Sequence, residues 1–515
     1  MFKYFALLIC LSISAILPAQ TSKRYDIADA DEHYNHHNFL MALPIYKELL
    51  KQDKNNADIQ YKIAECYLNT HINKHEAIKY LEFCCNEPKV NSERVLRLGQ
   101  AYRLGNKIED AIKTFEKYKI LEPKKKKIAD REIEICKNAI SLILDPKNVS
   151  FTNLGKEINS EFADYYPWVT QDESFLAFTT RRKGQTANRL EVDGYYASDI
   201  YTSKVENGKW IKAENLGPKI NSSLDEQVVG LKADGSEMII YIDHIDKYGD
   251  IYYTEKKNGV FPKYVAYNEV INEKIEHSAS ISPDGNTLFF VRGEDREAQT
   301  DIYMCRKLPN GNWGVPYKLG PEVNSEYHED FPYLSTDGKT LFFSSEGHNT
   351  MGGFDLFKSV WNPEDNSWTE AENLGYPINT TDDDRSISLT PDNRVGYISA
   401  LRPGGQGDLD IYRIKFNDAV QKITLYIGYI TLGDSINHPK DYVANILAVN
   451  VFNNEEYSFA PNPSTGKFVM ALPAGTYNIT VSADGYTNYK DKVFIPEVGP
   501  PTITEEKKNY KLAKQ

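Results

Sequence analysis

The sequence lacks long apolar runs after its N-terminus, and it lacks an excess of basic residues. Beyond the first twenty residues no segment approaches the roughly 18 apolar residues that a membrane-spanning helix needs, so we expect no transmembrane span in the mature chain. Lys and Arg number 60 against 73 Asp and Glu, a formal net charge of −13. This charge opposes binding to nucleic acid, which we do not expect as a partner.

Cysteine is also scarce, and its spacing supports neither a disulfide framework nor a zinc site. Six cysteines occur in 515 residues, and Cys10 lies in the N-terminal apolar run. The other five are Cys66, Cys84, Cys85, Cys136 and Cys305. We therefore expect no metal and no cofactor, while one disulfide between helices stays open as an alternative.

Sequence motifs of catalysis are missing as well. The chain contains no Gly-x-Ser-x-Gly turn, no His-Glu-x-x-His helix and no glycine loop of the phosphate-binding type. His33, His36 and His37 form a small cluster, but their spacing does not match a helical metal site completed by other ligands. We therefore expect no catalytic residues and predict that the protein is not an enzyme.

The first nineteen residues have the parts of a secretory signal. Lys3 precedes an apolar run from Phe5 to Ile16, and Ala19 supplies a small residue before Gln20. We expect residues 1-19 to be a signal peptide and the mature chain to start at Gln20. Cys10 lies in the middle of the apolar run after a bulky residue, so lipid attachment is not expected. The chain is thus predicted to leave the cytoplasm.

A repeat of 34 or 35 residues is present between Arg24 and Tyr118. Small residues recur at two of its positions and a large apolar residue at a third: Ala30, Ala64 and Gly99; Ala42, Ala77 and Ala111; Tyr46, Leu81 and Phe115. This pattern is typical of helix-turn-helix tetratricopeptide repeats, in which small residues let paired helices approach. Residues 128 to 143 have the apolar stripe of a closing helix. We predict an all-α tetratricopeptide-repeat solenoid over residues 20-147.

Such arrays bind peptides or helices along a concave face, which the first helix of each repeat lines. By repeat position we predict that a partner protein binds this face at Asp31, Tyr34, Tyr61, Glu65, Leu68, Gln100 and Arg103. The alternative is that some of these side chains only cover neighbouring helices.

A longer period, about fifty residues, follows over residues 148-417. Its units share an Asp-Ile-Tyr-like triplet that begins at Asp199, Asp250, Asp301, Asp355 and Asp410, with hairpin turns around it. Each unit reads as a four-stranded meander, and such units arranged radially make a β-propeller. The last unit lacks its outer strand, which residues 148 to 154 can supply. We predict five blades, with six as the alternative.

Each propeller unit also carries an Ile-Asn or Val-Asn pair, with a polar residue five positions after the Asn. These polar residues are Asp164, Glu226, His277, Glu329 and Asp384. Placed just before the innermost strands, they are predicted to ring one mouth of the channel, where a cation could bind. The favoured alternative is that they hold loops and connect neighbouring blades, without a metal.

From about residue 420 the chain returns to short strands. Tyr477, Ile479 and Val481 alternate with polar residues, as in a half-buried antiparallel sheet. We predict a β-sandwich of the Ig or prealbumin-like type over residues 420-515.

Two segments resemble known families. Ser282 to Phe290 (SPDGNTLFF), followed by Asp301-Ile302-Tyr303, resembles the TolB-type WD-like propeller repeat. Leu472 to Tyr477 with Gly485-Tyr486 resembles the carboxypeptidase regulatory-like domain. Behind a signal peptide, this order of modules is similar to a Bacteroidetes family of type IX secretion accessory proteins, which adds an OmpA-like peptidoglycan-binding domain. This sequence stops at Gln515, where that domain would begin, so peptidoglycan binding is not implied.

The resemblance implies a periplasmic scaffold at the outer membrane, in type IX secretion or gliding. Its expected partners are other envelope proteins, such as an outer-membrane β-barrel or a component of the secretion machinery. The alternative is a secreted or cell-surface protein whose propeller binds a glycan or a peptide, since Pro461-Asn462-Pro463 and Gly466 are similar to the start of a type IX sorting domain. A hydrolase is a third class, because TolB-like propellers accompany some peptidases.

Overall fold

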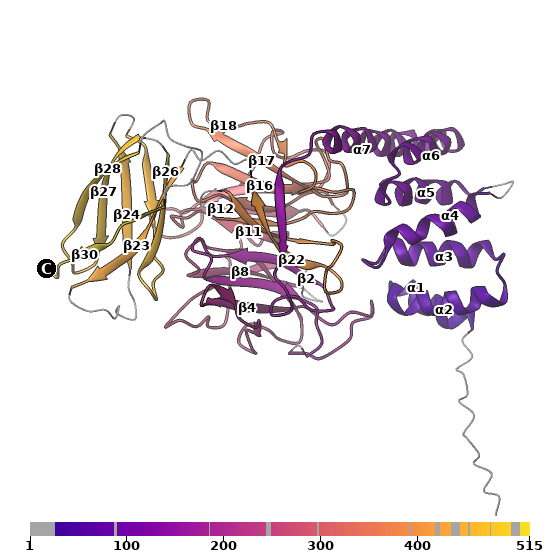
Figure 1. Ribbon diagram of the computed structural model, residues 1–515, viewed down its shortest axis with the longest axis horizontal. Coiled ribbons are helices and arrows are strands. Elements are labelled where there is room, and N and C mark those ends of the chain that lie inside the picture. Colours follow the sequence, from indigo (N-terminus) through magenta and orange to yellow (C-terminus); the bar gives the residue numbers. More distant parts are fainter. Residues whose placement is uncertain are drawn as a thin grey trace, which may run out of the picture.

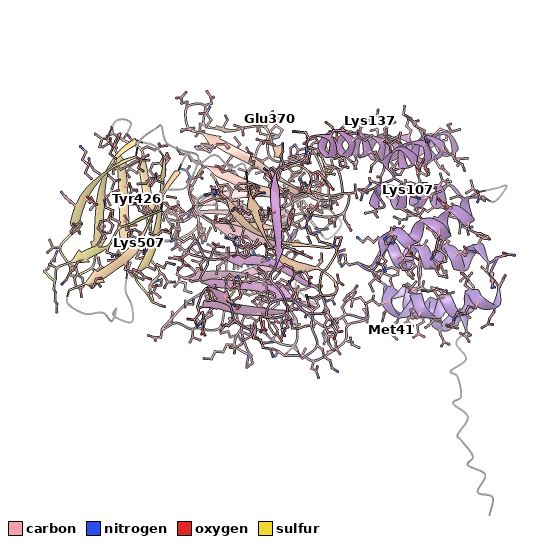
Figure 2. The ribbon with its side chains drawn as sticks, in the orientation of Figure 1. Met41, Lys107, Lys137, Glu370, Tyr426 and Lys507 are labelled. Atoms are coloured by element: carbon pink, nitrogen blue, oxygen red, sulfur yellow. The ribbon has the colours of Figure 1, made fainter. Side chains whose placement is uncertain are left out.

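The computed structural model describes residues 26–86, 90–184, 186–243, 249–295, 298–390, 393–417, 423–433, 443–451, 454–473, 475–495 and 505–515. A stack of helices, a β-propeller and a β-sandwich lie in a row along the long axis (Figure 1). Figure 2 shows Met41 and Lys107 among the helices, and Tyr426 and Lys507 in the sandwich at the other end. In this part of the chain no helix has the length and apolar character to cross a membrane. The expected signal peptide lies outside the described residues.

The helical part consists of antiparallel neighbours in chain order. Its α-helices are α1 (Ile27–Asn35), α2 (Phe39–Gln52), α3 (Ala57–Leu68), α4 (Ala77–Cys85), α5 (Ser92–Leu104), α6 (Ile108–Leu121) and α7 (Lys126–Leu144), with 3₁₀ turns η1 (Lys74–Glu76) and η2 (Pro123–Lys125). Side-chain oxygens cap several N-termini; Asn56, for example, accepts from the N–H of Ile59 at 3.0 Å. The repeated small residues lie in the core, where a Cβ on Gly99 would be 2.4 Å from Cε1 of Phe115. The 34-residue repeat is therefore a packing repeat.

The expectation of an extended all-α solenoid is wrong. Within the described residues seven α-helices form and the last ends at Leu144, whereas β structure continues from Val149 to Leu512. A solenoid covers its end with a terminal repeat that has a polar outer face. Here the final helices bury theirs against the propeller, because Met351 of the propeller joins the core that contains Ile133 and Cys136 of α7.

Five antiparallel sheets form the blades of the propeller. Blade 1 contains β2 (Asp164–Val169), β3 (Phe175–Thr180), β4 (Asp199–Glu206), β5 (Lys209–Trp210) and β6 (Glu214–Asn215); blade 2 contains β7 (Asp225–Leu231), β8 (Glu237–Asp243), β9 (Asp250–Glu255) and β10 (Val265–Ala266); blade 3 contains β11 (Ile275–Ile281), β12 (Thr287–Gly293), β13 (Thr300–Arg306) and β14 (Tyr317–Lys318). Blade 4 contains β15 (Glu329–Leu334), β16 (Thr340–Ser345), β17 (Asp355–Asn362), β18 (Ser367–Trp368) and β19 (Glu372–Asn373); blade 5 contains β20 (Ile387–Leu389), β21 (Val395–Ala400), β22 (Asp410–Phe416) and β1 (Val149–Asn153).

Blade 5 closes the ring with strands from both ends of the propeller. β1 pairs antiparallel with β22, and Val149 lies opposite Phe416. The prediction that the N-terminal strand completes the last blade is confirmed.

Aromatic rings fill the centre of the propeller. Tyr166 of β2 and Phe331 of β15 have ring centroids 4.1 Å apart, and those of Trp168 and Tyr333 are 5.9 Å apart. These rings come from blades 1 and 4, which are not neighbours, so their contacts span the axis. The channel is therefore packed with side chains at this level.

The sandwich consists of two sheets. One contains β26 (Lys467–Pro473), β23 (Ile423–Leu432), β29 (Glu505–Lys507) and β30 (Tyr510–Leu512), and the other contains β25 (Glu456–Phe459), β24 (Ala444–Asn450), β27 (Gly475–Ala483) and β28 (Tyr489–Ile495). Tyr477, Ile479 and Val481 are buried between them. The sandwich contacts the propeller through an ion pair between Glu455 and Lys339. The expected domain boundaries, at 147/148 and at 417/420, stay a prediction.

A candidate binding crevice between the helices and the propeller

The helical stack docks on three loops of the propeller. Nη1 of Arg103, at the end of α5, donates to the carbonyl of Thr381 at 2.8 Å. Nζ of Lys74 lies 2.7 Å from Oδ1 of Asp382. Three further contacts join Arg131 Nη2 to the Glu346 carbonyl at 2.6 Å, Asn138 Nδ2 to the Thr350 carbonyl at 3.0 Å, and His71 Nδ1 to Asp408 Oδ1 at 2.7 Å. The loops before β17, β20 and β22 thus hold the helices at one mouth of the propeller.

Part of the predicted concave face lies at this junction. Leu68, Gln100 and Arg103 line a cavity of about 230 Å³ whose opposite wall contains Gly353 and Asp383 of the propeller. The chain's own propeller therefore faces this end of the helical surface. Whether these residues bind a partner stays a prediction.

The other predicted residues of that face contact neighbouring helices. Asp31 accepts a hydrogen bond from the Tyr46 hydroxyl and pairs with Lys62, both at 2.5 Å. Glu65 is buried with its Oε1 3.3 Å from Nε of Arg97. The remaining two are Tyr34, whose ring packs edge-on against Phe39, and Tyr61, which lies under the guanidinium of Arg94. These contacts agree with the alternative that some of the set only covers helices.

Four members of the predicted channel ring are buried acids that bind their own loops. Asp384 accepts from the N–H of Thr380 at 2.7 Å and from its hydroxyl at 2.9 Å. Glu226 accepts in the same way from Ser222. Asp164 and Glu329 accept from the corresponding Ser160 and Ser325. Each acid therefore fixes the loop that enters its innermost strand, as the favoured alternative proposed.

The third unit departs from this pattern, because His277 does not take the position that the acids have in the other units. Its buried acid is Glu276, which accepts from Nε of Arg292 at 2.6 Å. The connection from Asn272 to this acid is one residue shorter than in the other units. A one-residue shift moves a side chain to the other face of a strand, so His277 points elsewhere. The acidic residue directly before His277 was the signal that could have corrected the register.

His277 instead joins a charged chain at the start of the innermost strands. Its Nδ1 lies 3.3 Å from Oδ1 of Asp330, whose Oδ2 is 3.9 Å from Nη1 of Arg385. Arg385 also pairs with Asp383 at 3.0 Å and lies 4.0 Å above the ring of Phe354. Burial alone would lower the pKa of His277, but the Asp330 carboxylate raises it above its ordinary value.

The larger cavity of the crevice lies between the helix ends and this mouth of the propeller. Its volume is about 540 Å³, within the range of small-ligand sites. Leu104 and Asn106 line it from the helices, and Tyr165, Tyr195 and Arg402 line it from the propeller. Among the described residues no group of three His, Cys, Asp or Glu side chains is placed to hold a metal ion. Of the predicted ring, Asp384 lines this cavity, and the predicted face residues Leu68, Gln100 and Arg103 line the smaller cavity next to it.

Comparisons with known proteins find matches among solved structures, and these include TolB proteins. No family model matches the chain, and no curated protein matches it. Solved structures that match include TolB from Acinetobacter baumannii, at 16% identity over 50% of this chain and 56% of its own, with a TM-score of 0.34. The putative TolB from Agrobacterium tumefaciens matches at 15% identity over 53% of this chain and 98% of its own, with a TM-score of 0.28. At these values the likeness carries no argument about function.

The tetratricopeptide, regulatory-like and type IX resemblances have no counterpart in these matches and stay expectations.

The absence of catalytic motifs predicts that the protein is not an enzyme. This prediction is wrong. The matching structures also include the endo-arabinase from Bacteroides thetaiotaomicron, at 17% identity over 51% of this chain and 96% of its own, with a TM-score of 0.32. A β-1,2-mannobiose phosphorylase from Listeria innocua is another match. An enzymatic activity is therefore open, since function depends on site residues grafted on a fold.

Proposed function

We propose that this protein is an adaptor that binds a segment of another protein in the crevice between its helices and its propeller. The observation that supports this proposal is that Leu68, Gln100 and Arg103 line one cavity together with Thr381 and Asp383 of the propeller. Helical arrays and propeller mouths both present concave surfaces for polypeptide segments. A partner seated here would contact both modules at once.

The cellular setting is the second part of the proposal. The signal-like residues 1-19 and the order of modules in the sequence support a location in the periplasm, at the outer membrane. The resemblance to type IX accessory proteins supports a partner from the secretion or gliding machinery. A secreted ligand-binding protein is the competing outcome of the experiment below.

The experiment is affinity purification of a C-terminally tagged full-length chain from detergent-solubilised envelopes, followed by mass spectrometry. Leu104 lines both cavities, so Leu104→Trp would place a bulky ring in the crevice. Leu144, at the end of α7, is 79% exposed and provides the matched control Leu144→Trp. We expect an outer-membrane protein to be recovered with the wild type and with Leu144→Trp, and to be lost with Leu104→Trp.

Two results would contradict the proposal. Recovery of the bare protein from soluble or extracellular fractions would favour the secreted alternative. Equal recovery of a partner with both tryptophan variants would place its binding site outside the crevice.

A further inference from the structure

The positive charges that line the larger cavity are mostly matched by acids of the same chain. Arg181 makes a two-pronged pair with Asp193, at 2.9 and 3.2 Å. Arg385 pairs with Asp383, and His71 contacts Asp408. These groups are held by internal partners and offer little free charge to a ligand.

Arg402 differs from the other cations of this cavity. Its Nη2 donates to the carbonyl of Pro377 at 2.7 Å, and its guanidinium carbon lies 3.4 Å from the ring centroid of Phe151. Its buried Nε has no hydrogen-bond partner, and no carboxylate of the described residues forms an ion pair with it. The ring of Phe151 therefore holds the plane of a guanidinium whose charge lacks a direct partner.

Asp384 does not form an ion pair with Arg402. Asp384 lines the same cavity, but both of its hydrogen bonds from Thr380 go to Oδ2. Burial, followed by the charge of Asp355, raises the pKa of Asp384 well above its ordinary value. Burial lowers the pKa of Arg402, and the charge of Asp384 opposes this shift.

We propose that Arg402 binds a carboxylate of a short peptide segment that enters the crevice. This inference rests on the proposed adaptor function, because the ligand is taken to be part of a protein. A planar guanidinium that forms no ion pair within the described residues is suited to a carboxylate, which accepts charge-assisted N–H bonds. Tyr165, Tyr166 and Tyr195 line the same cavity and provide apolar rings with polar tips for adjacent side chains. The carboxylate comes from the C-terminus of the segment or from an Asp or Glu side chain.

The test uses the immobilised full-length protein and a library of random hexapeptides in two forms, one with free C-termini and one amidated. Retained peptides are identified by mass spectrometry, and the dissociation constant of the most enriched peptide is then measured by calorimetry. Arg402→Gln removes the charge and Arg402→Lys keeps it. Arg189→Gln is the matched control, because Arg189 is exposed outside the cavity and pairs with Glu191.

We expect Arg402→Gln to weaken peptide binding about tenfold or more, Arg402→Lys to weaken it less, and Arg189→Gln to leave it unchanged. Retention of the free form alone assigns the carboxylate to the C-terminus. Retention of both forms with enrichment of Asp or Glu assigns it to a side chain. Because the free and amidated forms are compared on the wild type, the test does not depend on the folding of a variant.

Three results would overturn the inference: retention of neither library, retention without any preference for a carboxylate, or binding that Arg402→Gln leaves unchanged. Retention of oligogalacturonate in place of peptides, lost with Arg402→Gln, would reassign the site to an acidic sugar. If tagged protein still recovers a partner through the crevice while Arg402→Gln has no effect, the adaptor function stands and only the role of Arg402 fails.

Discussion

The side chain of Asn379 satisfies both backbone polar groups of Leu356 in the neighbouring blade. Its Oδ1 accepts from the Leu356 N–H and its Nδ2 donates to the Leu356 carbonyl, both at 2.8 Å. The same arrangement recurs around the ring in the pairs Asn159 with Ile411, Asn221 with Ile200, Asn272 with Ile251, and Asn324 with Ile302. The repeated Asn is therefore a connection between blades.

Replacing Asn379 by Ala leaves the buried N–H of Leu356 without its acceptor, whereas the Leu356 carbonyl keeps a bond from the N–H of Leu374 at 3.0 Å. We expect Asn379→Ala to lower the free energy of unfolding by about 1–3 kcal/mol. Urea denaturation of the full chain measures this change. Asn268 is exposed, and Asn268→Ala serves as the control that leaves stability nearly unchanged. Equal effects of the two variants would show that the connection contributes nothing.

Gly99 and Phe115 test the packing of the helices. An Ala at residue 99 places its Cβ 2.4 Å from Cε1 of a fully buried ring. We expect Gly99→Ala to destabilise the chain by about 1–3 kcal/mol, although Ala favours helix formation over Gly by about 1 kcal/mol. In a double-mutant cycle, Phe115→Leu should cost less in the Gly99→Ala background than alone. Strictly additive effects in urea denaturation would contradict the close contact.

Arg103 connects the helices to the propeller. Besides its bond to Thr381, its Nε lies 3.4 Å from Oε2 of the buried Glu132. Arg103→Met removes the bond and leaves Glu132 without its cation, so we expect a loss of about 3 kcal/mol. Small-angle scattering should show a larger radius of gyration, because the helical stack detaches. Lys113→Met, on the exposed side of α6, should leave both quantities unchanged; a compact Arg103→Met protein would show that other contacts suffice.

Glu226 predicts a pH dependence of stability. Burial raises the pKa of its carboxyl to about 7, although the hydrogen bonds from Ser222 oppose this shift. An unfolded Glu titrates near about pH 4.3, so the folded state binds more protons between these values. The free energy of unfolding contributed by this group is therefore highest at acidic pH and falls as pH rises through about 7. Glu226→Gln cannot ionise, and its free energy of unfolding should fall less steeply over this window.

The control for this measurement is Glu109→Gln, at an exposed position of α6. Its pH dependence should match that of the wild type in urea titrations at several pH values. A Glu226→Gln protein with the wild-type pH dependence would mean that Glu226 is ionised in the folded state at acidic pH.

Local regularities of the sequence predicted much of the propeller. The sequence predicts a strand at 148 to 154 because this segment matches the missing outer strand of the last unit, and Val149–Asn153 pairs there. Glu276 was missed because one residue is absent from its loop, and a rule counted from Asn272 then selects His277. The extended solenoid was wrong because the repeat pattern does not reveal what covers the last helix.

The crevice could not be predicted from local pattern. Arg103 and Thr381 are 278 residues apart in the chain, and their contact follows from the docking of two modules. Arg402 has no counterpart in the repeat pattern, since its role depends on Phe151 of the first propeller strand and on the Pro377 carbonyl that holds its Nη2. Such sites depend on which charges remain unmatched after folding, and a sequence period carries no information on that balance.

The pairing of β1 with β22 also sets an order of events in biosynthesis. β1 directly follows the helices, yet its partner Asp410–Phe416 is made only after the other four blades. The helical repeats contact mainly their neighbours in the chain and can fold as they emerge. The strand after them must wait with its hydrogen-bonding groups unpaired, so a nascent chain would carry an open sheet edge until Phe416 is available. Translation that stalls within the fifth blade would therefore leave an intermediate whose unpaired strand β1 can pair with a strand of a second chain.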